Sequence, residues 1–267
     1  MELIIFYILI FCIGAMFGSF FTLAVYRLPL HENITHERSF CPKCHHKLGF
    51  WDMIPILSYI ALRGKCRYCK EKIRPRYLIL EVCSGIVFLL FTISICGTCK
   101  LDVNTIFYIA LALLYIAGWF IIAGIDKETR QIHIGVIFYE MCIVAIYMVY
   151  LYILTDVNIY RYVIYLFFIC LLLILETWYL RKKLKSNYTI LTLLIILIML
   201  AFTNRGQMLL TITLTLLAIA IDGILEMFLH KKKHIQIKEA MQLPIAYYIC
   251  VCHIITLIIT NLLVCRW

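Results

Sequence analysis

The chain has 267 residues, of which 64% are hydrophobic and only 15% are charged. Its mean hydropathy is +0.95. A soluble domain is about half apolar and about a quarter charged, so this composition excludes a soluble domain, a disordered chain and a fibrous repeat. It indicates a polytopic membrane protein. The net charge of +10 is then assigned to loops that orient the chain, and nucleic acid is not expected as a partner.

Eight apolar segments of roughly bilayer length follow one another along the chain. They are residues 3–26, 78–96, 104–125, 133–154, 159–180, 188–203, 207–229 and 241–264. A helix is the only open structure that satisfies every backbone group in lipid, so each segment is predicted to be helical. The fold class that we expect is an all-α polytopic membrane protein with about eight transmembrane helices. The first segment is too long, and lacks the basic start, for a cleavable signal peptide.

The basic residues predict the orientation of these helices. Of the 25 Lys and Arg residues, 21 lie in alternate connecting segments, and eleven of those lie in 27–77. Only Lys100, Arg161, Arg205 and Arg266 lie on the opposite side. The positive-inside rule places the basic segments in the cytoplasm and both termini outside the plasma membrane. The expected organisation is a first transmembrane helix at 1–26, a cytoplasmic loop at 27–77 and a seven-helix membrane domain at 78–267.

The cytoplasmic loop contains two CxxC pairs, Cys41 with Cys44 and Cys66 with Cys69, separated by 21 residues. Each pair forms a tight turn that can present two thiolates to one ion, and four thiolates suit tetrahedral Zn²⁺. The loop is too small to fold on a core of its own, so a structural metal is expected there. Reduced thiols are the alternative, and two disulfides are disfavoured in the cytosol.

Other histidine and cysteine residues are not expected to bind this metal. His45 and His46 adjoin the first pair, and we expect them to be solvated neighbours rather than ligands. A third CxxC, Cys96 to Cys99, lies in a short turn on the outer side. A local disulfide and two unpaired thiols are both open there.

Ionisable groups inside a span are costly, so each one is a functional candidate. The acidic residues concerned are Glu81, Glu140, Glu176, Asp222 and Glu226, with Asp126 at a membrane boundary. Glu81 and Glu176 lie near Arg76 and Arg181, and ion pairing or snorkelling is expected for them. Two facing aspartates would share a proton, one acting as base on a water and the other as acid on an amide. Asp126 as a plain helix-end charge and Asp222 as a buried hydrogen-bond acceptor are the alternatives.

The N-terminal region carries several motifs in sequence. Segment 18–29 reads GSFFTLAVYRLP and precedes the two cysteine pairs. Residues 54–59 read IPILSY, and the pattern Arg76-Tyr77-x-x-x-Glu81 follows the second pair. These motifs resemble those of the prepilin peptidases, membrane aspartic proteases that process type IV pilin and pseudopilin precursors. Ile125-Asp126 resembles the surroundings of the family's first catalytic aspartate. The clear similarity covers about residues 18–85.

The resemblance implies a function. Members of the family cleave a short basic leader after a glycine on the cytoplasmic side of the membrane, and many also N-methylate the new terminus with S-adenosylmethionine. The cysteine-bearing loop is the family's zinc-binding region. The implied partners are prepilin or pseudopilin precursors, together with the lipid bilayer. No residue pattern in this chain points to S-adenosylmethionine independently of the resemblance.

The second half of the chain departs from the family pattern. The family's second catalytic aspartate lies in a GxGD motif at the start of the sixth span, and the corresponding residues 185–191 read KSNYTIL. Neither Asn187 nor Tyr188 replaces a carboxylate as acid or base at neutral pH. Two interpretations follow. The chain is an active peptidase with Asp126 and a relocated Asp222, or an inactive relative that binds precursors or an assembly machine. A metal-sensing or transport protein is disfavoured, because no charged pathway crosses several spans.

Overall fold

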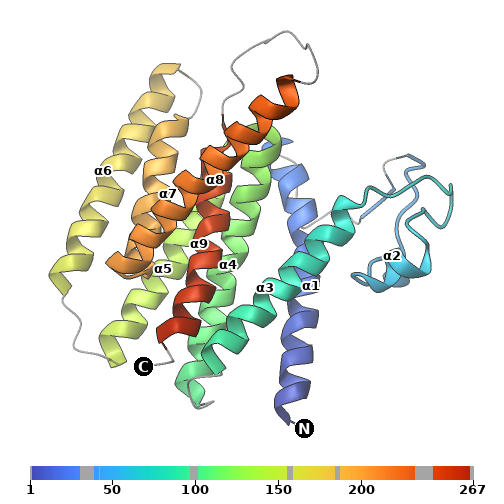
Figure 1. Cartoon of the computed structure of the whole chain (residues 1–267), viewed down its shortest axis with the longest axis horizontal. Helices are drawn as coiled ribbons and strands as arrows, with labels where there is room; N and C mark the ends of the chain where they lie inside the picture. The colour runs from blue at the N-terminus through green and yellow to red at the C-terminus, as the bar shows by residue number, and fades with distance from the viewer. Residues whose placement is uncertain are drawn as a thin grey trace. The chain divides into compact units, whose positions relative to one another are not determined.

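The computed structural model describes residues 2–30, 39–41, 43–96, 102–154, 159–183, 187–231 and 243–264, and the structural statements below concern these residues. Most of them form helices, with two isolated β-bridges and no strand among them (Figure 1). The helices are α1 Glu2–Arg27, η1 Leu28–Leu30, η2 Phe50–Asp52, α2 Leu57–Ala61, α3 Arg76–Cys96, α4 Val103–Thr129, α5 Ile134–Leu154, α6 Ile159–Lys183, α7 Tyr188–Phe202, α8 Arg205–Lys231 and α9 Ile245–Val264.

Each predicted apolar segment corresponds to one helix, so the fold class is confirmed. Among the described residues, seven helices are long and apolar enough to cross a membrane. The eighth, α7, has only 15 residues, which span about 22 Å at 1.5 Å per residue. Eight of its residues are buried, among them Leu191, Leu194 and Ile195, so one face of α7 packs against neighbouring helices.

The chain divides into two compact units. The first comprises residues Met1–Ile109 and Asn261–Trp267, and the second comprises Ala110–Thr260. In the first unit, α1 packs along α3, and small residues allow close contact. A Cβ atom on Gly18 would lie 2.7 Å from the Glu81 Cα. The Ser84 hydroxyl donates a hydrogen bond to the Gly14 carbonyl at 2.7 Å. Gly14 and Gly18 therefore allow the two helices to approach closely.

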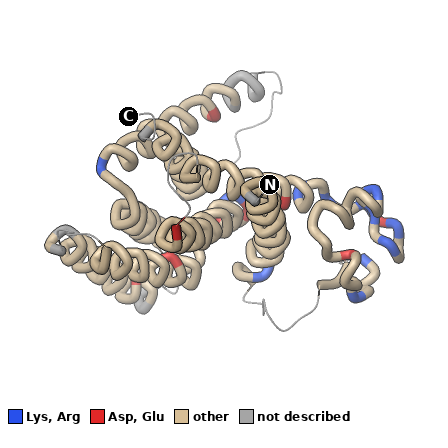
Figure 2. The backbone as a smooth tube through the Cα atoms, turned by 90° about the horizontal axis from the view of Figure 1, so that it is seen from below, with Lys and Arg blue, Asp and Glu red and all other residues tan. Residues whose placement is uncertain are grey.

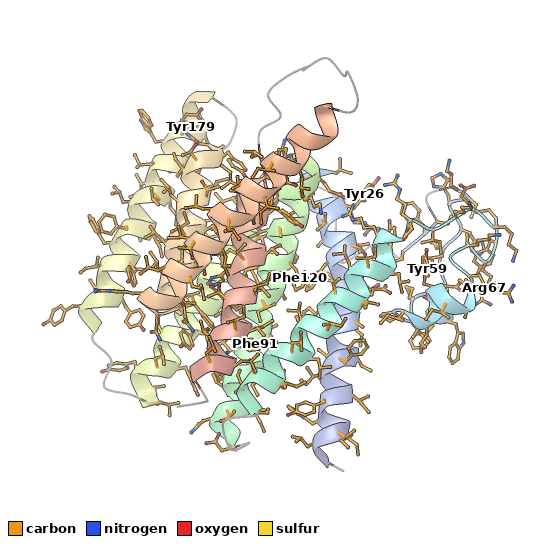
Figure 3. All side chains as sticks on the ribbon, in the orientation of Figure 1. Tyr26, Tyr59, Arg67, Phe91, Phe120 and Tyr179 are labelled. Atoms are coloured by element: carbon orange, nitrogen blue, oxygen red, sulfur yellow. The ribbon has the colours of Figure 1, made fainter. Side chains whose placement is uncertain are left out.

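The second unit buries aromatic side chains between its helices. The Tyr115 ring of α4 stacks on Phe202 of α7, with ring centroids 3.9 Å apart. The Tyr115 hydroxyl also shares a 2.9 Å hydrogen bond with His253 Nε2 of α9. All three helices are thus joined at one level. In an 18-residue apolar stretch of α4, 67% of the residues are buried, compared with 11% in such a stretch of α6. Figure 3 shows the side chains on these helices, including Phe120 of α4 and Tyr179 of α6.

Candidate functional site

Two turns of the loop between α1 and α3 carry the cysteine pairs, and they have the same local structure. In each turn, the N–H of the first cysteine donates to the carbonyl five residues later. Cys41 donates to His46 at 3.0 Å, and Cys66 donates to Glu71 at 2.8 Å. An isolated antiparallel bridge flanks each turn, and the bridges pair Phe40 with Lys47 and Lys65 with Lys72. The two turns are therefore equivalent in geometry as well as in cysteine spacing.

The two turns bring four cysteines together. The Sγ atoms of Cys41, Cys44, Cys66 and Cys69 all lie within 4.8 Å of one another, and those of Cys41 and Cys69 are 3.8 Å apart. In a tetrahedral site with Zn–S bonds of about 2.3 Å, the sulfur atoms are about 3.8 Å apart. The cluster therefore has the size of a four-thiolate zinc centre. The predicted grouping of the four cysteines is confirmed.

The thiols of this cluster ionise unequally. Burial alone would raise the pKa of Cys41, but hydrogen bonds from the Cys44 and Lys43 N–H groups and from neighbouring thiols lower it to about 7. The Glu71 N–H lowers the pKa of Cys69, whereas desolvation and the three neighbouring thiols raise it to about 11. Four thiolates this close repel one another, and a cation among them stabilises the fully ionised set.

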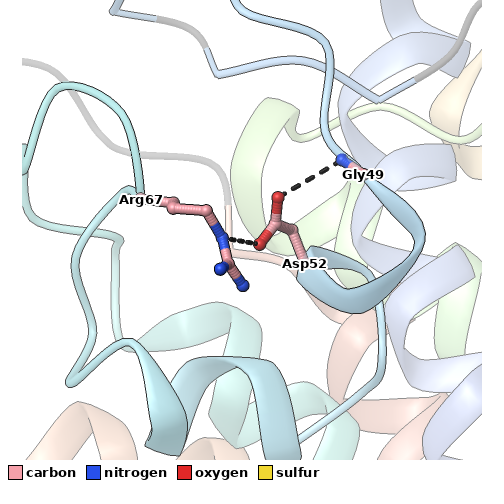
Figure 4. Close-up of polar contacts among 3 residues, drawn as sticks. All are labelled: Gly49, Asp52 and Arg67. Carbon is pink, nitrogen blue, oxygen red and sulfur yellow. Dashed lines mark hydrogen bonds and ion pairs between the residues drawn. The ribbon is translucent and has the colours of Figure 1, made fainter.

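An ion pair connects η2 to the second cysteine turn. Arg67 Nε donates to Asp52 Oδ1 at 2.7 Å, and the Gly49 N–H donates to Asp52 Oδ2 at 3.3 Å (Figure 4). The Asp52 side chain is 5% exposed, whereas that of Arg67 is 51% exposed. This half-exposed pair adds little to stability. It does place η2 beside the turn that carries Cys66 and Cys69.

Glu81 connects the loop to α3. Its Oε2 atom accepts a 2.7 Å hydrogen bond from the Ile56 N–H. Ile56 has a φ of 62°, which is unfavourable for a β-branched residue and needs support from its surroundings. The ion pairing or snorkelling expected of Glu81 stays a prediction. The structure shows that its buried side chain accepts a hydrogen bond from the residue immediately before α2.

Asp126 lies where the ends of three helices meet in the second unit. Although the sequence places it at the end of a span, α4 continues to Thr129 and the Asp126 side chain is fully buried. Its Oδ2 atom accepts hydrogen bonds from the Tyr188 hydroxyl of α7 at 3.0 Å and from the Tyr247 N–H of α9 at 2.8 Å. The Tyr247 N–H belongs to the first turn of α9, where the helix dipole favours a negative charge. The buried Oδ1 atom has no hydrogen-bond partner among the described residues.

Tyr188, which we did not expect to act as an acid or a base, contacts Asp126 directly. Its hydroxyl donates to Asp126 and accepts from the Ala246 N–H at 3.1 Å. Its position in the chain could have indicated this contact, because Tyr188 lies in the stretch that corresponds to the family's second aspartate. A search for acids and bases misses it, since a neutral hydroxyl can only donate to a carboxylate or accept from an amide.

Asp222, the other predicted catalytic residue, lies half-buried on α8. Its Oδ2 atom accepts a hydrogen bond from the Tyr248 hydroxyl of α9. Asp126 and Asp222 therefore contact neighbouring residues of α9. No hydrogen bond joins the two carboxylates in the part of the chain that the structure describes.

The other acidic residues differ in whether their carboxyl groups have a hydrogen-bond partner. Glu176 Oε1 accepts a 2.9 Å hydrogen bond from the Asn187 N–H, which precedes α7. Glu140 is fully buried on α5, and neither of its oxygen atoms has a hydrogen-bond partner among the described residues. Gly118 of α4 makes room for it, since a Cβ atom there would lie 1.9 Å from Glu140 Oε1. The side chain of Glu226 and the whole of Cys99 lie outside the described residues.

Comparison with known proteins identifies the N-terminal region. Residues 12–95 match the family model of the Bacterial Peptidase A24 N-terminal domain. A prepilin leader peptidase/N-methyltransferase of Myxococcus xanthus is 39% identical over 84 residues, which are 32% of this chain and 25% of that protein. The protein of the same name from Vibrio cholerae is 41% identical over 85 residues, 28% of this chain and 34% of its own length. One from Burkholderia pseudomallei is 50% identical over 58 residues, 22% of this chain and 19% of its own length.

These matches confirm the resemblance to the prepilin peptidases over the N-terminal region. The helices and the matches together identify a multi-pass membrane protein. The matched stretch spans about a quarter to a third of the length of the Myxococcus and Vibrio relatives. No solved structure matches the chain.

Proposed function

We propose that this protein processes type IV prepilin or pseudopilin precursors at the cytoplasmic face of the plasma membrane, cleaving their leader as an aspartic endopeptidase. The observation that supports this most directly is the buried Asp126 at the junction of α4, α7 and α9. It lies in a chain whose residues 12–95 match the peptidase A24 N-terminal domain. The basic connecting segments support the cytoplasmic placement of the loop.

In this mechanism Asp126 is one of two carboxyl groups. The ionised carboxyl takes a proton from a water that attacks the scissile carbonyl, and the protonated one donates to the departing amine. Asp222 is the second carboxyl that we propose, since both aspartates contact the first turn of α9. The unpartnered Oδ1 of Asp126 is the oxygen left to hold the water.

The four cysteines are proposed to hold one structural Zn²⁺. Four protein ligands leave no open coordination position, so the metal orders the loop and takes no part in cleavage. N-methylation of the new terminus with S-adenosylmethionine is a second proposed activity. It rests only on the names of the relatives.

A cleavage assay tests the peptidase directly. The full chain is co-expressed with a prepilin-type precursor, and wild type is compared with Asp126→Asn and Asp222→Asn. Asp102→Asn is the matched control, because Asp102 is exposed and accepts a 2.8 Å hydrogen bond from the Thr105 N–H at the start of α4, and Asn caps helices equally well. Cleavage is expected in wild type and the control and in neither of the other variants. Loss in Asp126→Asn alone would rule out Asp222 as the second acid.

One contact favours a second candidate function, binding of precursors or of an assembly machine without cleavage. The Tyr188 hydroxyl and the Tyr247 N–H both donate to Asp126 Oδ2. A tyrosine, and not a second carboxyl, therefore contacts this oxygen. An inactive relative would show no cleavage beside an enzyme that does cut. It would also retain a co-purifying precursor equally well in wild type and in Asp126→Asn.

A further inference from the structure

Four large apolar side chains lie exposed on the cysteine-bearing loop. Phe50 and Trp51 of η2 are 71% and 73% exposed, and Leu57 and Ile60 of α2 are 65% and 61% exposed. The two short helices contact each other, and we call their four exposed apolar side chains together the η2–α2 patch. The Phe50 and Trp51 rings meet edge to face, with centroids 5.8 Å apart. An exposed apolar patch of this kind marks a binding site for a membrane or a protein.

The contact with α3 sets the level of this patch. Ile56, the residue before α2, donates to Glu81, which lies five residues after the first residue of α3. At 1.5 Å per residue, Glu81 is about 7 Å along the helix from its start. Because α3 is a candidate membrane span that begins at Arg76, this contact lies close to one end of the span.

The charge around the patch is strongly positive. Residues 39–75 contain only two acidic residues, Asp52 and Glu71, and Asp52 is paired with Arg67. The basic residues of this stretch are Lys43, Lys47, Arg63, Lys65, Arg67, Lys70, Lys72 and Arg74. Figure 2 shows them gathered on the loop at the right of the view. Exposed aromatic and aliphatic side chains next to Lys and Arg are typical of segments that lie on anionic membranes.

We propose that the η2–α2 patch inserts into the bilayer interface beside α3, while the basic side chains around it bind the headgroups of anionic lipids. The charge favours a lipid surface over a basic leader peptide, which this loop would repel. The depth set by the Ile56–Glu81 hydrogen bond favours lipid over a soluble partner. The loop would then carry its cysteine site along the membrane surface, and this attachment does not depend on catalysis.

Trp51 provides a direct reporter. The full chain is reconstituted in vesicles of phosphatidylcholine, with or without phosphatidylglycerol, in which part of the phosphatidylcholine is brominated near the headgroup end of one acyl chain. Subtracting the emission of Trp51→Phe from that of wild type isolates the Trp51 signal. We expect this signal to be quenched by bromine and protected from aqueous iodide. The quenching should be stronger when phosphatidylglycerol is present.

Two double variants separate the apolar and the ionic contributions. Leu57→Gln with Ile60→Gln should reduce bromine quenching of Trp51, because it makes the exposed face of α2 polar. Lys70→Gln with Lys72→Gln should remove the dependence on phosphatidylglycerol. A Trp51 signal quenched by iodide and not by bromine would overturn the proposal. A signal shielded from both quenchers would also overturn it and would indicate a protein on the patch. Equal quenching with and without phosphatidylglycerol would overturn headgroup binding.

Discussion

At the scale of single residues, the surroundings of Asp126 decide what chemistry the chain can perform. One of its oxygens is held by Tyr188 and the α9 backbone, and the other is buried without a described partner. A tyrosine at this place satisfies hydrogen bonds but cannot exchange a proton with a carboxylate near neutral pH. The contact therefore stabilises the junction of three helices whether or not the chain cleaves a substrate.

Tyr188→Asp tests whether the tyrosine replaces a second acid. The new carboxyl would lie near Asp126, and two carboxyls this close share a proton. If wild type does not cleave, the variant is expected to introduce cleavage of a prepilin-type precursor that Asp126→Asn then abolishes. Immunoblotting of the precursor in cells measures the outcome. A Tyr188→Asp chain that is folded and still inactive would argue against this site as the place of catalysis.

Tyr188→Phe tests the structural role of the same hydroxyl. Its removal leaves the Ala246 N–H and the Asp126 carboxylate each without one partner, at a cost of about 1–3 kcal/mol for such a buried group. The thermal midpoint of the detergent-solubilised protein should fall. Tyr26→Phe is the control, since the Tyr26 side chain is 62% exposed and its removal should leave the midpoint unchanged. Equal midpoints for the two variants would contradict the role assigned to Tyr188.

At the scale of helices, the pairing of α1 with α3 depends on small residues. Gly18 meets the backbone of α3 closely, and Gly14 accepts the hydrogen bond from Ser84. Backbone atoms cannot move aside as the end of a flexible side chain can. The α1–α3 pair is therefore sensitive to a single added methyl group.

Gly18→Ala should destabilise this helix pair by about 1–3 kcal/mol, the usual cost of overpacking. The added Cβ would lie 2.2 Å from Ser84 Oγ and 2.8 Å from the Leu80 carbonyl. Gly223→Ala is the matched control, because nothing lies within 4 Å of a Cβ there and Ala favours a helix over Gly. Thermal unfolding in detergent should show a loss for the first variant and no loss for the second. Similar midpoints would mean that α1 and α3 do not pack as described.

At the scale of the whole molecule, the cysteine site and the membrane orientation are the features to establish. The purified chain should contain one zinc ion, measured by elemental analysis, and Cys44→Ser should lose most of it because one thiolate is removed from a four-ligand site. Cys142→Ser is the control, since Cys142 is exposed on α5 and lies outside the cluster. Zinc bound equally by both variants would contradict the site.

Orientation is measured with reporter fusions. A fluorescent protein fused after Arg130, in the turn between α4 and α5, should fluoresce because that turn is expected in the cytoplasm. Alkaline phosphatase fused after Asn204, between α7 and α8, should be active because it is expected outside. The reverse result at both positions would invert the orientation and place the cysteine loop outside.

The sequence by itself determined the features that depend on local composition and spacing. Apolar length predicted the eight helices, because lipid leaves the backbone few alternatives. The spacing of the cysteine pairs predicted their cluster, because each turn closes within a few residues. The GSFFTLAVYRLP segment and the motifs after it predicted the family of the N-terminal region.

Only the tertiary structure decided which side chains meet across helices. The contact of Tyr188 with Asp126, the support of Ile56 by Glu81 and the burial of Glu140 against Gly118 each join residues from different elements. Apolar periodicity is weak in a membrane helix, because lipid and a helix interior are both apolar, so the sequence does not fix which face of each helix turns inward. The rotation and packing of the helices supply that information.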